Sequence, residues 1–286
     1  MPPFSAPLLG ALCLVLAEAL FAGVGALVKH LSETVSQTQL VFFRNLFAMA
    51  ALMPWILRAG LRSLKTDFFH LHLMRATSGL IAMYCFFVVL ANLPLAQAMM
   101  ALLVSPFIVP IIAKLWLKEE IGQKSLIAIG IGFVGAGFIL RPVGGEEMNF
   151  YIVLALGCAC LVAFTKCTIR HLSGTEPSAR IVIYFTGLAT LVSAVPMLIN
   201  WQPMPVEAWQ WLALMGLLAA LGQLLMTKAF KLASPVRIGL LTYSSVIFAA
   251  ILGYWFWDEP VHMGLIGGFV LILWAANLTI RQRWLW

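Results

Sequence analysis

The stretch LAQAMMALLVSPFIVPIIAKLWLKE, residues 95–119, decides the fold of this chain. It is an apolar run of 25 residues, and crossing the hydrocarbon of a membrane takes roughly 20. Two prolines interrupt its helical pattern, and Glu119 closes it. The stretch therefore predicts a membrane-spanning helix with a break inside it.

A second stretch of the same kind follows at residues 235–259, PVRIGLLTYSSVIFAAILGYWFWDE. At an offset of 140 the two align without a gap, with Glu119 on Glu259. Earlier in each half, KHLSET at 29–34 matches RHLSGT at 170–175. We therefore expect two related halves, residues 1–143 and 144–286.

Composition assigns the chain to the polytopic membrane proteins. It has 286 residues, of which 62% are hydrophobic and 10% charged, whereas a soluble domain carries about 25% charged residues. The net charge of +7 does not predict nucleic-acid binding, because the basic residues lie between apolar runs. The five cysteines lie in apolar stretches without zinc or disulfide spacing, so we expect neither a metal nor a cofactor.

Apolar runs of spanning length predict an all-α integral membrane protein with ten transmembrane helices and no soluble domain. The ten expected spans are about 8–29, 38–57, 71–91, 94–117, 124–140, 150–170, 179–199, 207–230, 234–257 and 261–280.

The distribution of Lys and Arg predicts the orientation. With the N-terminus in the cytoplasm, only Lys29, Arg44 and Arg141 of the 18 basic residues lie nearer the opposite side, so we expect both termini to be cytoplasmic. Five spans in each half mean that the second half enters the membrane upside down. Such inverted repeats are typical of secondary transporters, which bind substrate near the midplane between the halves.

Several motifs resemble the EamA type of the drug/metabolite transporter superfamily, over essentially the whole chain. The clearest are SPFIVPIIAKLWLKEEIG (105–122), IGFVGAGFILRP (131–142), FFRN (42–45) and HLMRA (72–76). The second half lacks the first proline of span four and has Val246 there. The resemblance implies ten helices around a central cavity, lined by spans one, three, four, six, eight and nine. It also implies ATP-independent transport of small organic metabolites, without fixing which one, in a bacterial inner membrane.

Three charged residues inside spans are the sharpest candidates for binding a substrate. Glu18 lies near the middle of span one, where a charge is costly unless it is paired or hydrated. It could line the cavity and take a proton or pair with a cationic substrate, and the structural alternative is pairing with a buried basic residue. Arg44 and Arg75 lie several residues into spans two and three and could bind a carboxylate or phosphate. The structural alternatives are an ion pair between Arg44 and Glu18, and snorkelling of Arg75 to the cytoplasmic interface. Lys166 fits an interface anchor better than a site residue.

Weaker candidates are lone polar groups at membrane depth, each with a structural alternative in helix–helix hydrogen bonding. The four consecutive residues 242–245 carry three hydroxyls and a phenol, which cannot all face lipid at low cost. The repeat places Arg237 opposite Gln97, and the structural alternative for Arg237 is an interface anchor near a cytoplasmic helix end. The substrate-binding candidates of this kind are Tyr84, Gln97, Ser105, Gln223, Arg237, Tyr243 and Ser244.

Prolines and glycines predict moving and packing surfaces. Pro106 and Pro110 free carbonyls in span four, which favours a gating helix. Gly130 and Gly135 belong to a GxGxxG pattern inside an apolar span, so they favour helix packing over dinucleotide binding. The small faces of spans five and ten allow a homodimer without requiring one.

These features together predict a secondary transporter that moves a small polar metabolite across the plasma membrane by alternating access. The excess of basic groups in the spans favours a substrate that bears a carboxylate or is zwitterionic. The alternatives are a receptor or assembly protein that transports nothing and, with less support, an enzyme embedded in the membrane, for which the spans offer no histidine-and-acid constellation.

Overall fold

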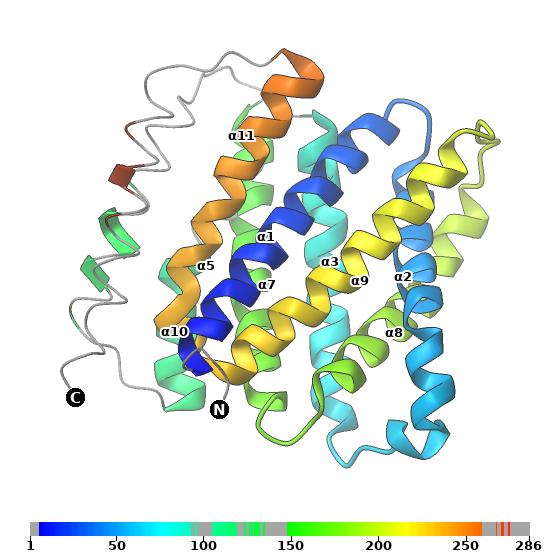
Figure 1. Cartoon of the computed structure of the whole chain (residues 1–286). Helices are drawn as coiled ribbons and strands as arrows, with labels where there is room; N and C mark the ends of the chain where they lie inside the picture. The colour runs from blue at the N-terminus through cyan, green and yellow to red at the C-terminus, as the bar shows by residue number, and fades with distance from the viewer. Residues whose placement is uncertain are drawn as a thin grey trace.

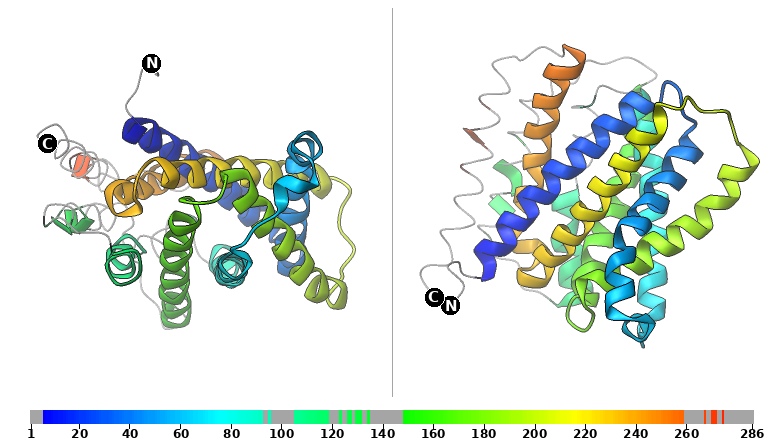
Figure 2. Two further views of the ribbon diagram at one scale, coloured as in Figure 1. Left: turned by 90° about the horizontal axis from the view of Figure 1, so that it is seen from below. Right: turned by 45° about the vertical axis from the view of Figure 1, so that its right-hand side comes forward.

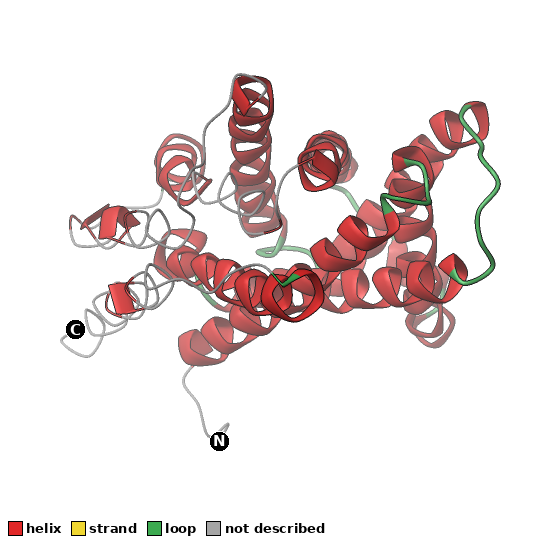
Figure 3. Ribbon diagram, turned by 90° about the horizontal axis from the view of Figure 1, so that it is seen from above, coloured by secondary structure: helices red, strands yellow, loops and turns green. Residues whose placement is uncertain are grey.

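The computed structural model describes residues 6–92, 95, 105–118, 123, 126, 127, 129–131, 134, 148–258, 267, 270, 271 and 274. Within these residues all regular structure is helical (Figure 3). Expected spans five and ten, Gln97 and Gly135 lie wholly or largely outside them, as does the boundary between the halves.

Seven described helices or helix series are long and apolar enough to cross a membrane, and they confirm expected spans one, two, three and six to nine. The elements are α1 (Ala6–Leu31), α2 (Gln37–Ala59), η1 (Leu61–Leu64), α3 (Phe69–Asn92), α5 (Ser105–Ile112), η2 (Ala113–Leu117), α7 (Met148–Leu172), α8 (Ser178–Ile199), α9 (Ala208–Leu232), α10 (Pro235–Ile238), η3 (Gly239–Tyr243) and α11 (Ser244–Trp257).

The packing of the helices follows an inverted repeat. Helix α1 and its counterpart α7 run in opposite directions (Figure 1). The two most extensive helix contacts are α1 with α9 and α3 with α7. The repeat relates these two contacts to each other, because α7 is the counterpart of α1 and α9 is the counterpart of α3. Contacts of α1 with α11 and of α7 with α5 form a second matched set, and α2 packs on its own counterpart α8 (Figure 2).

Local backbone geometry repeats as well. Lys118 and Asp258, which are 140 positions apart, are the two described non-glycine residues with positive φ, at 54° and 49°. A left-handed residue with a side chain costs about 1–2 kcal/mol, so its occurrence at the ends of spans four and nine reflects a shared architecture. The amide of Ser32 donates to Val28 at 2.9 Å, and that of Ser173 donates to Ile169 at 2.8 Å, so the turns after α1 and α7 also match.

Spans four and nine both depart from regular α-helix. In span four, α5 contains Pro110 and passes into the π-helical segment η2. In span nine, the single turn α10 passes into the 3₁₀ segment η3 before α11 begins. Such interruptions inside a helix often mark hinges.

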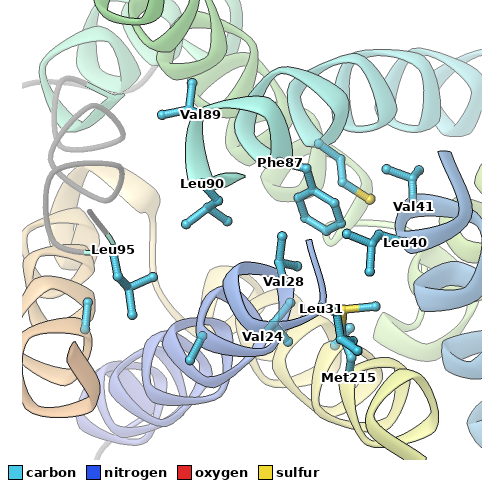
Figure 4. Close-up of a cluster of buried hydrophobic side chains, with 14 of the residues drawn as sticks. Val24, Val28, Leu31, Leu40, Val41, Phe87, Val89, Leu90, Leu95 and Met215 are labelled. Carbon is cyan, nitrogen blue, oxygen red and sulfur yellow. The ribbon is translucent and has the colours of Figure 1, made fainter. Parts of the chain in front are cut away.

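The largest apolar core lies toward the end of α1 and joins α1, α2, α3 and α9 (Figure 4). Val28, Leu31, Leu40 and Met215 are at most 2% exposed there. Val24, Phe87 and Leu90 belong to the same cluster and also line the central cavity. The cavity is therefore bounded at this end by packed apolar side chains.

Candidate functional site

A cavity of about 180 Å³ lies between the two halves. Its charged groups are Glu18 from α1, Arg44 from α2, Arg75 from α3 and Lys166 from α7. The remaining lining is mostly apolar, with a few hydroxyls and one amide: Phe21, Val24, Gly25, Gly79, Ala82, Met83, Phe86, Phe87, Leu90, Cys158, Val162, Thr165, Phe185, Gln223, Met226, Thr242 and Ser245. Spans one, three, six, eight and nine line it as the resemblance implied, whereas no described residue of span four does, and spans two and seven (α2 and α8) contribute as well.

Arg44 and Arg75 converge on one aromatic ring. The guanidinium carbon of Arg75 lies 3.9 Å from the ring centroid of Phe185, and that of Arg44 lies 5.9 Å from it. Both arginines are buried, at 4% and 1% exposure, and they lie close enough to repel each other. Arg75 is therefore in the cavity wall and does not snorkel to the interface.

The hydrogen bonds of the two guanidiniums leave donors unused. Arg44 donates through Nη1 to Asn45 Oδ1 at 2.9 Å, and Arg75 donates through Nη2 to Gln223 Oε1 at 2.7 Å. Nε of both residues and Nη1 of Arg75 are buried without a hydrogen-bond partner. No described carboxylate forms an ion pair with either arginine, so the expected alternative of an Arg44–Glu18 pair is wrong.

Two buried cations without an anion are costly. The desolvation penalty is several kcal/mol per ion even after relaxation, and stacking on an aromatic ring returns about 0.5–2 kcal/mol. The unused N–H groups of a guanidinium form a planar fork that matches a carboxylate or phosphate. This part of the cavity is thus chemically complementary to an anionic group.

Glu18 and Lys166 form a second charged cluster. Glu18 is 6% exposed and lines the cavity, and the positive charge of Lys166 acts on its carboxylate without an ion pair between the two. Lys166 donates through Nζ to Ser105 Oγ at 3.3 Å and to Thr242 Oγ1 at 3.2 Å. Lys166 is 5% exposed and lines the cavity, so its interpretation as an interface anchor is wrong.

The other candidates divide between the cavity and the scaffold. Gln223 lines the cavity, and Ser105 reaches it through Lys166. Tyr243 is fully buried and donates to the Ile129 carbonyl at 3.2 Å, while Ser244 donates to the Leu241 carbonyl one turn back. Both of these hydroxyls hold structure and do not line the cavity.

Five further candidates also lie away from the cavity lining. Arg237 is exposed on α10, and Tyr84 on α3 is half-buried with a hydroxyl that has no partner. Pro106 and Pro110 are buried in α5, and a Cβ added to Gly130 would meet no described atom within 4 Å. The prediction that Pro106, Pro110, Gly130 and Gly135 serve gating or packing stays a prediction.

Sequence reasoning missed Lys166, Thr242, Ser245 and Phe185 as cavity residues. Of residues 242–245, it chose the middle two, whereas the structure turns the outer two toward the cavity. Thr242 and Ser245 are three positions apart and so share one helical face, whereas the two adjacent residues that were chosen do not. A signal for Lys166 was available, because a lysine with several apolar residues on both sides is rare inside a span.

Comparison with known proteins shows one family over nearly the whole chain. Residues 8–141 and 149–281 each match the EamA-like transporter family. The chain is 32% identical to the pseudopaline exporter CntI of Pseudomonas aeruginosa over 278 residues, covering 96% of each. It is 28% identical to a riboflavin transporter of Vibrio cholerae, covering 96% of this chain and 93% of that one. It is 24% identical to an S-adenosylmethionine uptake transporter of Rickettsia bellii, covering 89% and 87%.

The fold also has a solved counterpart. One crystal structure superposes with a TM-score of 0.80 at 16% identity and covers 97% of this chain and 98% of its own.

Proposed function

This chain belongs to the EamA-like transporter family, and we propose that it moves a small metabolite bearing a carboxylate or phosphate through the cavity between its repeats. It is a multi-pass membrane protein of a transporter family and not an enzyme. The relatives are named for pseudopaline, riboflavin and S-adenosylmethionine, so membership alone leaves the substrate open.

The observation that carries the proposal is the convergence of Arg44 and Arg75 without a counter-ion among the described residues. Both arginines line a cavity whose other walls are largely apolar, and three of their nitrogens have no hydrogen-bond partner among the described residues. An anionic group of the substrate placed there accepts hydrogen bonds from the guanidinium N–H groups, while the apolar part of the substrate packs against side chains such as Phe86 and Phe87. The substrate is therefore an organic anion with apolar surface and not a bare inorganic ion.

Transport follows from alternating access, in which one repeat moves against the other around a fixed site. The interruptions in spans four and nine supply the bending points. The proposal places the protein in a bacterial inner membrane, with both termini in the cytoplasm, because of the bias of Lys and Arg toward that side. The proposal allows, without requiring, a homodimer that forms through the small-residue faces of spans five and ten.

The test is uptake into proteoliposomes of an externally added radiolabelled anionic metabolite, which a binding screen identifies. Arg44→Gln and Arg75→Gln should each lower uptake by roughly tenfold or more, since a hydrogen bond to a charged group contributes about 1.5–3 kcal/mol. Arg58→Gln is the matched control, because Arg58 lies on α2 but is exposed. Binding without flux in the unmodified protein would favour a receptor, and normal flux in both variants would exclude the arginine site.

A further inference from the structure

Lys166 connects the two interrupted helices of the protein. Its Nζ donates to Ser105 at the start of α5, in span four of the first repeat, at 3.3 Å. It also donates to Thr242 in η3, in span nine of the second repeat, at 3.2 Å. Ser105 is fully buried and Thr242 is 5% exposed, so these bonds form inside the protein and without competition from bulk water.

The position of this contact matters more than its strength. Spans four and nine are counterparts in the repeat: Thr242 lies inside the 3₁₀ segment of span nine, and Ser105 begins the helix α5, which passes into the π-helical segment of span four at Ala113. A single ammonium thus joins the segments that can bend, across the boundary between the repeats. Lys166 itself extends from α7, which is an uninterrupted helix.

We propose that Lys166 is a positioning residue that keeps spans four and nine together through Ser105 and Thr242, and that the ammonium group of a zwitterionic substrate replaces it as the positive charge facing Glu18. This rests on the proposed transport through the same cavity. The substrate class is narrowed to molecules that carry an anionic group for the arginines and an amine for Glu18, joined by an apolar body.

The distribution of charge supports two separate subsites. Arg75 interacts with Arg44, whereas Glu18 interacts with Lys166. Glu18 is the acidic residue of the cavity lining, and Lys166 is its counter-charge. A substrate ammonium that approaches Glu18 must compete with Lys166, and the loss of its counter-charge weakens the hold of Lys166 in the cavity.

The competing explanation is that Lys166 is only a buried lysine satisfied by two hydroxyls. Both explanations predict that Lys166→Met lowers stability. They differ in ligand affinity, because removal of a competitor strengthens binding of an amine, whereas loss of a purely structural residue does not. They also differ in cavity access, because only a residue that holds the two spans together closes the cavity.

Cys158 provides a reporter of cavity access that needs no substrate. It is fully buried and lines the cavity on α7. In a chain whose other four cysteines are replaced by alanine, we would measure the rate at which N-ethylmaleimide reacts with Cys158. Lys166→Met should raise this rate roughly tenfold or more if each charged hydrogen bond holds the spans as expected, while Lys166→Arg should stay close to the unmodified rate.

A second single-cysteine chain distinguishes opening of the cavity from general loosening. Cys13 is 5% exposed on α1, in a core cluster with α9, and it does not line the cavity. Its reaction rate should be unaffected by Lys166→Met. An unchanged rate at Cys158, or an equal increase at both cysteines, would overturn the role of Lys166.

The amine subsite is tested by thermal unfolding with matched ligands, namely the proteinogenic α-amino acids, each beside the carboxylic acid that lacks only the amino group. At least one amino acid should raise the Tm more than its partner acid does, and Glu18→Gln should abolish that difference. Lys166→Met should enlarge the difference while slowing flux. If the partner acids stabilise the protein as well as the amino acids do, the amine subsite is overturned and the arginine site stands. If neither class of ligand stabilises the protein, the amine subsite and the arginine site are both overturned.

Discussion

Phe185 holds in the second repeat the position that Arg44 holds in the first, at the offset of 141 that relates their helices, and Arg75 stacks on its ring at 3.9 Å. One repeat thus supplies two cations and the other supplies the aromatic surface between them. The two repeats have diverged at this point, so the site that accepts an anion is asymmetric although the scaffold is symmetric. An asymmetric site can orient a substrate that has different groups at its two ends.

Gly79 leaves the space that Arg75 occupies. A Cβ at this position would lie 2.6 Å from Arg75 Nη1 and 3.0 Å from Phe185 Cε2. We expect Gly79→Ala to push the guanidinium aside and weaken binding of an anionic ligand roughly tenfold, the value of one charged hydrogen bond. Stability should fall little, since the displaced group is the end of a flexible side chain.

Isothermal titration with the ligand and thermal unfolding without it would separate the two effects of Gly79→Ala. Gly157→Ala on α7 is the matched control, because its Cβ would meet no described atom within 4 Å. Unchanged affinity in Gly79→Ala would argue against Arg75 as a ligand-binding group.

In Gln223→Glu, the new carboxylate should take the place beside Arg75 that the anionic group of a substrate would occupy. Gln223 Oε1 already accepts from Arg75 Nη2 at 2.7 Å, so a carboxylate there would supply the counter-ion that the described site lacks. We expect the free energy of unfolding to rise by an amount on the order of 1–3 kcal/mol, and binding of the anionic ligand to fall. Gln210→Glu, exposed on the same helix, should change neither. A destabilised Gln223→Glu would show that Arg75 does not need an anion.

Gly216 permits the close approach of α9 to α2. A Cβ there would clash with Phe47 Cβ and lie 2.9 Å from the backbone nitrogen of Ala48. Backbone atoms cannot move aside as a side chain can, so Gly216→Ala should lower stability by about 1–3 kcal/mol. Gly187→Ala, with open space at its Cβ, should instead raise stability by up to about 1 kcal/mol through helix propensity. Equal melting temperatures for the two variants would contradict this packing.

Gln39 and Arg180 occupy matched positions on α2 and α8, and each reaches the opposite half. Gln39 Nε2 donates to the Gln202 carbonyl at 2.7 Å, and Arg180 Nε donates to the Ser63 carbonyl at 2.6 Å. We expect Gln39→Leu and Arg180→Leu each to lower the free energy of unfolding by about 0.5–3 kcal/mol, because each variant removes a hydrogen bond between the halves. The double variant should show additive losses, since the two contacts are far apart in sequence and lie in different loops. Strong non-additivity in denaturant unfolding would show that the two contacts form one coupled unit.

The sequence predicted the fold well because membrane-spanning runs and repeats leave direct traces in it. Length and hydropathy identified the spans, and the matching turns at residues 29–34 and 170–175 marked the inverted repeat. The left-handed residues Lys118 and Asp258 could not be foreseen, because few non-glycine residues adopt that geometry.

The site was only partly predictable. Glu18, Arg44, Arg75 and Gln223 were found because polar groups at membrane depth are rare and costly. Lys166 was assigned to the interface because its distance from the end of the span is within snorkelling reach, and only the packing of α7 against α5 and η3 shows otherwise. Phe185 has no signal in the sequence, since its role depends on the two cations that the fold brings to its ring.

The central claim is that an organic anion binds between Arg44 and Arg75, and thermal unfolding in detergent tests it most directly. The purified protein would be screened against organic acids, amino acids, nucleotide-like metabolites and vitamins. A ligand at one hundred times its Kd stabilises the folded state by about 2.7 kcal/mol, which raises the Tm. We predict that an anionic compound raises the Tm of the unmodified protein and of Arg58→Gln, and fails to do so in Arg44→Gln and Arg75→Gln. Equal stabilisation of all four proteins, or stabilisation by cationic compounds alone, would contradict the account.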